Sequence, residues 1–427
     1  MTQAQEAATT SAVPTAGIYH YQQLVGEWPT RFHLRVDPDG GGLLLANAAQ
    51  AAALSPVGVQ MAQGVLEGRS DEAITRDVKR TFRRAADEQV VADLASVRGL
   101  IADLTMPGDN YPVANLGDVG LSAWERQLAA PLQADVTQGE PDTLRQIVHK
   151  LWQAGVPHVT IAVDPQAEAA QLPRIVEAAG DIGMLTGLRS VASWLSAEVI
   201  EAAAMAGLDH LDLLYVTGSP QEHDVIAGAG DYAKVLAGFE QCRALELCPV
   251  AQVPLIAGNA DAVDEIAAEL VERGVTNLVF FALACPDDDS QAQAAGALPA
   301  RALPQVALLV EEAADDTMAR YLWAPPVRFD NARSLAEQVR AGPRTAGDIA
   351  IRVAAEGSVF PPRGGPICAG NLLTDAWEQI WGNECFTRYR ERLQAPTRCS
   401  DCPGLEICAA DCPKDPRGWS DDTQLDA

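Results

Sequence analysis

A unit of helix, glycine and apolar strand recurs through the middle of this chain. The expected strands are 132–136, 158–163, 184–185, 210–215, 250–255, 277–282 and 321–327. Between the first two, Leu144, Ile147, Val148 and Leu151 follow helical spacing. Strands of a parallel sheet read as apolar runs because helices cover both faces of the sheet. The pattern therefore predicts an α/β fold with an open or partial βα barrel.

The length and charge of the chain narrow its class. Its 427 residues suggest two or three domains. Lys and Arg number 31 against 58 Asp and Glu, a net charge of −27, and such a field repels phosphate backbones and anionic lipids. Residues 1–17 lack the basic start and apolar core of a secretion signal. We therefore expect a cytoplasmic protein that binds neither nucleic acid nor membrane.

The first region combines a hairpin with helices. Residues 31–36 alternate as a strand, 37–42 read as a turn and 43–45 as a second strand. Helices are expected from 54 to 66, after a Ser70 cap, and after an Asp87 cap. A hairpin followed by three helices is typical of a small winged-helix-like domain.

The same region resembles the PqqD-like recognition element of peptide-modifying systems. The matching residues are the run Phe-His-Leu-Arg-Val at 32–36, Gly-Gly-Leu-Leu-Leu-Ala-Asn at 41–47 and Leu-Glu-Gly-Arg-Ser at 66–70. The resemblance implies that the leader of a ribosomal precursor peptide is added as a strand beside the hairpin of residues 31–46, against helix 88–104. The residues expected to bind it are Phe32, Leu34, Val36, Leu43, Leu45, Val97 and Ile101. A generic winged helix used for packing or for DNA is the alternative.

A cysteine cluster marks the last region. Four cysteines lie in the pattern C-x2-C-x5-C-x3-C, at Cys399, Cys402, Cys408 and Cys412. Together with Gly370-Asn-Leu and a Trp-containing helix, this pattern resembles the SPASM extension of radical S-adenosylmethionine (SAM) peptide maturases. Four thiolates can hold one 4Fe-4S cluster or a zinc ion. Cys368 and Cys385 are further candidate ligands, because the upstream Gly-x4-Cys position of the family falls on Gly357 and Pro362.

The resemblance to radical SAM enzymes lacks its catalytic motif. That family holds its cluster with CxxxCxxC in the loop after the first barrel strand, which here reads Thr-Gln-Gly-Glu-Pro at 137–141. The first cysteine anywhere in the chain is Cys242. The family's glycine pair after the second strand is replaced by Val163-Asp-Pro165. We therefore expect a degenerate member that binds no SAM, and we assign no catalytic residue.

Three further groups of residues have plain structural explanations. Cys242, Cys248 and Cys285 are expected to be core thiols. His223-Asp224 is more often a loop or cap hydrogen bond than a catalytic dyad. The acidic run 287–289 is expected to be a solvated loop.

The expected organisation is a tail (1–18), a recognition domain (19–106), a linker (107–126), a degenerate barrel (127–345) and a small cysteine-rich extension (346–427). The predicted function is to bind a precursor peptide leader and to assist an active radical SAM maturase or another modifying enzyme. Two alternatives remain open. One is an iron-sulfur enzyme of peptide maturation that uses the auxiliary cluster; the other is a zinc-stabilised interaction protein.

Overall fold

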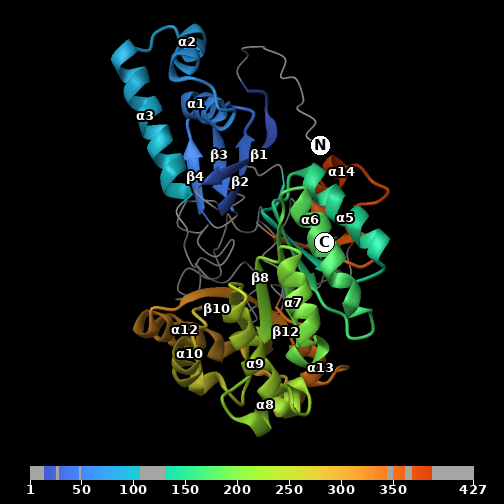
Figure 1. The fold of residues 1–427 in the computed structure, drawn as a ribbon. Coiled ribbons are helices and arrows are strands. Elements are labelled where there is room, and N and C mark those ends of the chain that lie inside the picture. The colour runs from blue at the N-terminus through green and yellow to red at the C-terminus, as the bar shows by residue number, and fades with distance from the viewer. Residues whose placement is uncertain are drawn as a thin grey trace. The chain divides into compact units, whose positions relative to one another are not determined.

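The computed structural model describes residues 14–25, 28–47, 50–105, 130–343, 350–360 and 368–386. The chain divides into two compact units, Met1–Gly108 and Asp109–Ala427, whose elements are labelled in Figure 1. In the described ranges, no helix is long and apolar enough to cross a membrane.

Unit 1 is built on an antiparallel sheet with strand order β1-β2-β3-β4. Its strands are β1 (Gly17–Val25), β2 (Trp28–Val36), β3 (Gly42–Ala46) and β4 (Gln50–Leu54). The predicted hairpin is confirmed as β2 and β3, joined by a turn in which the N–H of Asp37 donates to the carbonyl of Gly41. The sequence analysis missed β1 and β4. β4 is mainly alanine, which is depleted in strands, whereas β1 does contain strand-favouring residues, Ile18, Tyr19 and Tyr21 among them, so for β1 the signal was present and was overlooked.

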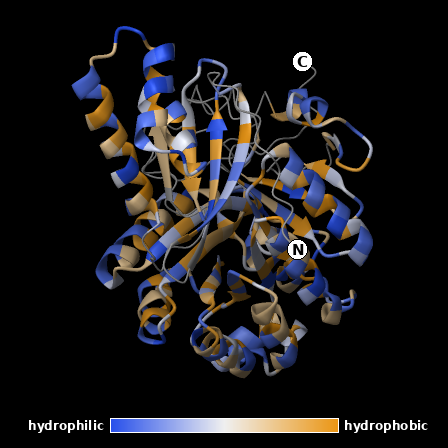
Figure 2. Ribbon diagram, turned by 45° about the horizontal axis from the view of Figure 1, so that its top comes forward, coloured by the Kyte–Doolittle hydropathy of each residue, from blue (hydrophilic) through white to orange (hydrophobic). Residues whose placement is uncertain are grey.

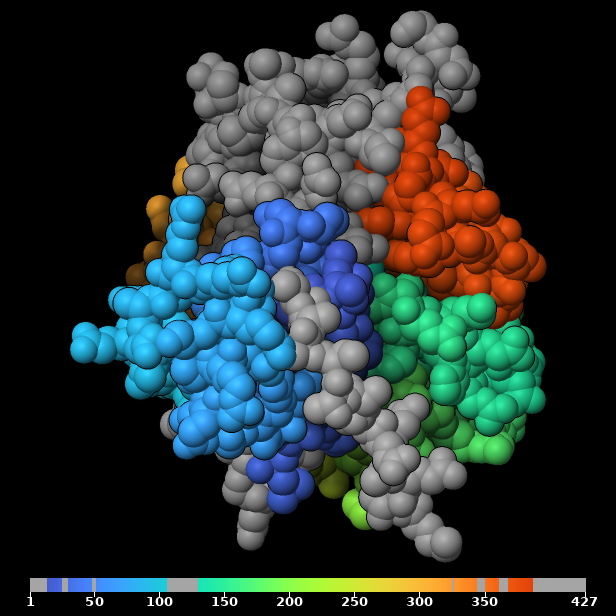
Figure 3. Space-filling model, turned by 90° about the horizontal axis from the view of Figure 1, so that it is seen from above, coloured from blue at the N-terminus to red at the C-terminus, as the bar shows by residue number. Residues whose placement is uncertain are grey.

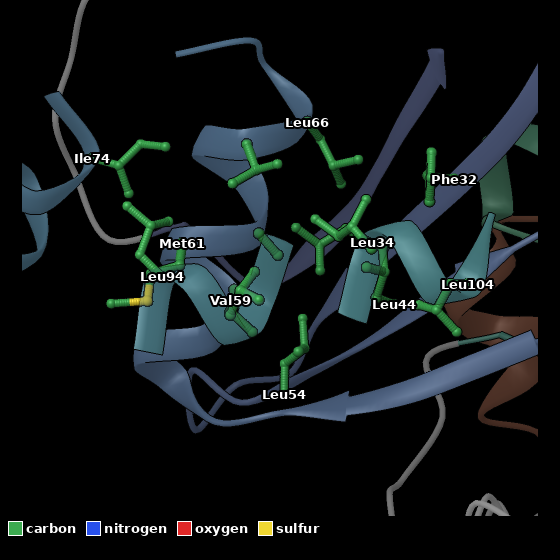
Figure 4. Packing of buried hydrophobic residues seen from close by; sticks show 14 of the residues in the cluster. Phe32, Leu34, Leu44, Leu54, Val59, Met61, Leu66, Ile74, Leu94 and Leu104 are labelled. Atoms are coloured by element: carbon green, nitrogen blue, oxygen red, sulfur yellow. The ribbon is translucent and has the colours of Figure 1, made fainter. Parts of the chain in front are cut away.

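Three helices follow the sheet: α1 (Pro56–Leu66), α2 (Asp71–Thr81) and α3 (Asp87–Leu104). The helices α1 and α3 pack on the strands, and α2 packs on α1 and α3. Ser70 caps α2 as predicted, because its side chain accepts from the N–H of Ala73. Asp87 does not cap α3; the cap position is Ala86, and Asp87 is the first helical residue. At this position its negative carboxylate interacts favourably with the positive end of the helix dipole and stabilises the helix. Phe32, Leu34 and Leu44 of the sheet pack against Val59 and Leu94 of the helices (Figure 4).

Unit 2 contains the predicted parallel sheet. Its strands run in the order β13-β5-β6-β7-β8-β9-β10-β12, with the short β11 also beside β10. They are β5 (Gln133–Thr137), β6 (His158–Ala162), β7 (Leu185–Ser190), β8 (His210–Leu214), β9 (Cys248–Leu255), β10 (Asn277–Cys285), β11 (Leu298–Pro299), β12 (Arg320–Arg328) and β13 (Ala350–Val353). The α/β prediction is confirmed, and each expected strand lies within a few residues of an observed one.

The connecting helices of unit 2 are amphipathic. They are α5 (Pro141–Ala154), α6 (Leu172–Asp181), α7 (Ala197–Met205), α8 (Pro220–Ala227), α9 (Asp231–Ala244), α10 (Val263–Glu272), α11 (Ser290–Ala294), α12 (Leu303–Thr317) and α13 (Leu335–Arg340). Figure 2 shows hydrophobic and hydrophilic residues alternating along them. On α5, the buried residues are the four whose spacing predicted the helix.

The sheet continues past residue 345, where the barrel was expected to end. β13 pairs in parallel with β5, with Ala350 opposite Gln133. Antiparallel β14 (Ser358–Phe360) and β15 (Gly370–Asn371) follow, and then α14 (Trp377–Trp381). The first strand of the expected extension is therefore the edge partner of the first strand of the barrel.

Candidate functional site

The loop between β5 and α5 is short and closed. It comprises Gln138, Gly139 and Glu140. The Gln138 side chain accepts from the N–H of Asp164 at 3.1 Å and donates to the carbonyl of Glu168 at 3.3 Å. A Cβ on Gly139 would lie 2.7 Å from Cβ of Ala355. Glu140 caps α5 by accepting from the N–H groups of Asp142 and Thr143. The loop thus contains no thiolate and has no room beside Gly139 for one.

An ion pair lies inside the barrel just before this loop. Nη1 of Arg189 on β7 lies 2.5 Å from a carboxylate oxygen of Asp135 on β5, and both side chains are nearly buried. Burial raises the pKa of Asp135, and the positive charges of Arg189 and Arg352 oppose that rise. Arg352 is the register neighbour of Asp135 on β13 and lies over the ring of Phe360 at 4.5 Å. Two arginines therefore neutralise one buried carboxylate.

A chain of buried polar side chains crosses the same interior. Nε2 of His158 lies 2.7 Å from Nε2 of His210, and Nδ1 of His210 lies 2.6 Å from Oδ1 of Asp212. The amide of Gln252 donates to the other oxygen of Asp212 at 3.0 Å. Burial, with a smaller contribution from His210, lowers the pKa of His158 well below its usual value. His158 is therefore neutral at physiological pH.

Gly187 makes room for this chain. A Cβ at that position would lie 1.9 Å from Cε1 of His210. The sequence analysis missed the polar layer, although a signal was present. His158 and Thr160, and likewise His210 and Asp212, occupy alternate positions of two otherwise apolar strands, so each pair faces the same side of the sheet.

Apolar side chains fill the interior beyond this polar layer. Leu214, Val250 and Phe281 of the strands pack with Ile226 of α8 and Val339 of α13 in one buried cluster. The two helices α8 and α13 also pack against each other. The barrel interior is therefore occupied by the protein's own side chains at these positions.

His223 connects the segment after β8 to the start of α9 through two buried hydrogen bonds. Its Nδ1 accepts from the N–H of Val216 at 3.2 Å, and its Nε2–H donates to Asp231 at 3.0 Å. Its sequence neighbour Asp224 instead accepts from the N–H groups of Gly230 and Tyr232. The two residues do not form a dyad, and the cap explanation is confirmed.

The acidic run and the three early cysteines are also structural. Asp289 caps α11, and Asp287 accepts from the N–H of Arg301 at 2.8 Å. Cys242 and Cys285 are fully buried, and burial raises the pKa of Cys242 to about 12. Cys248 is half-buried and accepts from the amide of Asn277 at 3.4 Å.

The predicted metal ligands Cys399, Cys402, Cys408 and Cys412 lie outside the described residues. Cys368 is exposed and Cys385 half-buried. Asn383 connects their segments: its amide donates to the carbonyl of Ala369 at 3.2 Å and accepts from the N–H of Cys385 at 3.0 Å. Over the described ranges, no three His, Cys, Asp or Glu side chains are arranged to hold a metal ion.

The seven residues expected to bind peptide are buried, and five of them, all except Leu43 and Leu45, belong to the hydrophobic core cluster of unit 1. Phe32, Leu34, Val36, Leu43, Leu45, Val97 and Ile101 are each at most 8% exposed. The hairpin itself cannot accept a further strand, because β2 already pairs with β1 and β3 already pairs with β4. The expectation that a peptide pairs with hairpin 31–46 is corrected accordingly. In the described part of the chain, the outer edges of the sheet are β1 and β4.

No protein-family model matches the chain. An AdoMet-dependent heme synthase of Methanosarcina barkeri is 22% identical over 286 residues, which cover 63% of this chain and 80% of that protein. The crystal structure of Streptococcus suis SuiB bound to S-adenosylmethionine superimposes with a TM-score of 0.58 at 11% identity, over 89% of this chain and 94% of SuiB. SuiB bound to its precursor peptide SuiA gives 0.54 at 11% identity, over 89% and 93%. The chain therefore has the fold of SuiB.

The residues after β5 do not fit the cluster that this fold implies. A radical SAM cluster needs thiolates there, and the three loop residues are Gln, Gly and Glu, each engaged in closing the loop. The buried carboxylates beneath this loop are paired with side chains of the same chain, Asp135 with Arg189 and Asp212 with His210. The fold is therefore present without cluster ligands at its first strand.

Acid should destabilise this protein in a window set by its buried histidines. The pKa of His20 is lowered to about 4 by burial, and those of its cross-strand partner His33 and of His158 are lowered well below 6.5. The unfolded chain binds protons at these sites below pH 6.5 and the folded chain does not. The contribution of these neutral histidines to the free energy of unfolding should thus be fully present above pH 6.5, and it should be lost as the pH falls towards 4.

Urea unfolding at pH 7.5, 6 and 5 checks this expectation. His149 on α5 is exposed, so His149→Asn should leave the pH dependence unchanged. A free energy of unfolding that stays constant from pH 7.5 to 5 would contradict the assignment of neutral buried histidines.

Proposed function

We propose that this chain binds a precursor peptide through unit 1 and assists a separate modifying enzyme without performing radical SAM chemistry itself. The observation that carries the second half is the closed, cysteine-free loop after β5. Support for the first half comes from the PqqD-like residues of unit 1 and from SuiB, which has the same fold and was crystallised with a precursor peptide. The partner would be an active radical SAM maturase or another modifying enzyme.

The peptide would pair with the outer edge of β4. An unpaired sheet edge offers N–H and C=O groups that an extended peptide can satisfy. The helix α3 packs beside β4, so the added strand would lie between an edge and a helix. The buried residues Phe32, Leu34, Val97 and Ile101 then support this groove from beneath rather than contact the peptide directly. Tethering a substrate in this way raises its concentration at a partner enzyme to roughly the millimolar scale.

Binding of a precursor peptide should require its leader. We expect removal of the leader to weaken binding at least about tenfold, because main-chain hydrogen bonds each contribute about 1 kcal/mol. Isothermal titration with a candidate precursor and its leaderless core measures the difference. Backbone N-methylation offers a matched control: methyls on alternate leader amides should abolish binding in one register and spare it in the other. Equal affinity with and without the leader would overturn the proposal.

The cysteine-rich extension is proposed to hold one metal centre on Cys399, Cys402, Cys408 and Cys412. After anaerobic reconstitution, we expect about four irons and matching sulfide per chain, lost in Cys402→Ser. Cys242→Ser replaces a buried thiol far along the chain and should leave the metal content unchanged. About one zinc per chain would instead favour the zinc-stabilised interaction protein.

The same preparation tests the enzymatic alternative, in which the auxiliary cluster performs the chemistry. Cleavage of SAM or modification of peptide by the purified chain alone would favour that alternative. Modification only after a second enzyme is added would favour the assisting role.

A further inference from the structure

A turn of the cysteine-rich extension lies directly against the loop after β5. β13 pairs in parallel with β5, with Val353 opposite Val136, so the chain that leaves β13 runs beside the chain that leaves β5. A Cβ on Gly139 would lie 2.7 Å from Cβ and 3.2 Å from the carbonyl oxygen of Ala355. Figures 1 and 3 show the extension, in orange-red, beside the blue-green segment that contains α5. A ligand on this loop would therefore have to displace the turn.

The backbone of this turn is fixed by its own hydrogen bonds. The turn comprises residues 354–357; the N–H of Gly357 donates to the carbonyl of Ala354 at 2.9 Å, and the N–H of Ala354 donates to the carbonyl of Ser358 at 2.8 Å. Gly357 has a φ of +93°, a left-handed conformation that glycine adopts without strain. A glycine in this conformation at the end of a tight turn is typical of short hairpin loops. The hairpin of β13 and β14 therefore ends in a turn of defined shape.

Asn371 ties the turn to the rest of the extension. Its side-chain amide donates to the carbonyl of Glu356 at 2.9 Å, and its Oδ1 accepts from the N–H of Leu373 at 2.9 Å. The N–H of Leu372 donates to the carbonyl of Gly357 at 2.9 Å. One side chain thus joins the turn to the segment that leads to α14.

We infer that turn 354–357 is a lid that the extension holds over the loop after β5, and that Asn371 positions it. Gln138 fixes the first residue of this loop by hydrogen bonds, whereas Gly139 has no side chain and is covered by Ala355. The place where a radical SAM enzyme needs thiolates is thus closed by a segment from much later in the chain. This inference does not depend on peptide binding by unit 1.

Hydrogen–deuterium exchange of the full chain, followed peptide by peptide, tests the lid. Asn371→Asp keeps the oxygen that accepts from Leu373 but cannot donate to Glu356. We expect amide exchange to become at least about tenfold faster in residues 354–358, because the turn loses a donor, and in residues 138–144, because the loop loses its cover.

The control is the same substitution at Asn331, which is exposed and donates to Asp289 at 2.9 Å. Asn331→Asp should leave the exchange of both segments unchanged. Faster exchange in the turn alone would mean that the loop closes without it, which would overturn the lid. Unchanged exchange in the turn would overturn the positioning role of Asn371.

A pair of substitutions across the contact gives a second test, which decides the matter if Asn371→Asp loosens the whole chain. Gly139→Ala brings two methyl groups too close together, so it should speed exchange in the turn about tenfold. Removing the opposing methyl group with Ala355→Gly should restore much of the protection. Gly258→Ala, where a Cβ meets nothing within 4 Å, should have no effect. If Gly139→Ala leaves the turn protected, or if Ala355→Gly fails to restore protection, the lid does not rest on this contact and the inference is overturned.

Discussion

Replacing Arg189 with Met should lower the free energy of unfolding by about 3–5 kcal/mol. The substitution removes the nearest positive charge from Asp135, a carboxylate with a side chain 8% exposed. A buried charge that loses its partner keeps the cost of leaving water without the attraction that offset it. Arg352 remains nearby, which places the loss towards the lower end of this range. Urea unfolding followed by circular dichroism measures the effect.

The control is the same substitution at the surface. Arg145 pairs with Asp142 on α5 at 3.1 Å, and both side chains are more than half exposed. Surface pairs contribute at most about 1 kcal/mol, so Arg145→Met should be nearly neutral. The Arg189→Met variant has a further signature. In this variant Asp135 should be neutral over a wider pH range, so the difference in free energy of unfolding between the variant and the wild type should decrease as the pH falls. A difference under about 1 kcal/mol at pH 7.5 would contradict the interpretation that Asp135 and Arg189 form a buried pair in which each stabilises the other.

Replacing Gly187 with Ala should have an effect of similar size. The new Cβ would lie 1.9 Å from Cε1 and 2.1 Å from Nε2 of His210. No real contact is that short, so the ring must move. Its hydrogen bonds to His158 and Asp212 would then break inside the barrel. Overpacking costs about 1–3 kcal/mol, and each buried group left unpaired costs about 1–3 kcal/mol more. We expect a total loss above about 3 kcal/mol.

Gly180 on α6 provides the comparison for this variant. A Cβ there would have its nearest neighbour at 3.8 Å, an ordinary contact. Alanine stabilises a helix by up to about 1 kcal/mol more than glycine does. Gly180→Ala should therefore be neutral or stabilising in the same urea experiment. If both alanine variants unfold at wild-type urea concentrations, then the ring of His210 is not held in place by its two polar neighbours.

The sequence predicted the parallel sheet because its strands are apolar runs between amphipathic helices, a pattern that depends only on local spacing. Val250, Phe281 and Leu211 behave accordingly and are buried. It did not predict that Asp135 would meet Arg189, or that His158 would meet His210. Those pairs join different strands, and their distance depends on the strand register, which no local pattern encodes.

The peptide site illustrates the same limit. The alternation of residues 31–36 correctly predicted a strand, and its apolar face was assigned to a ligand. The face packs instead on α1 and α3. Whether an apolar strand face binds a partner or forms the core depends on what covers it. The neighbours β1 and β4 decide that question for the hairpin edges. The alanine-rich sequence of β4 gives little strand signal.

The pairing of β13 with β5 bears on the order in which the chain can assemble. During synthesis, β5 emerges long before Ala350, the residue that lies opposite Gln133. Until β13 arrives, one edge of the growing sheet has no strand on it, and such edges template intermolecular pairing. Contacts so distant in sequence also close slowly. Most of unit 2 is therefore synthesised before its first strand is shielded, so we expect truncation before residue 350 to favour aggregation.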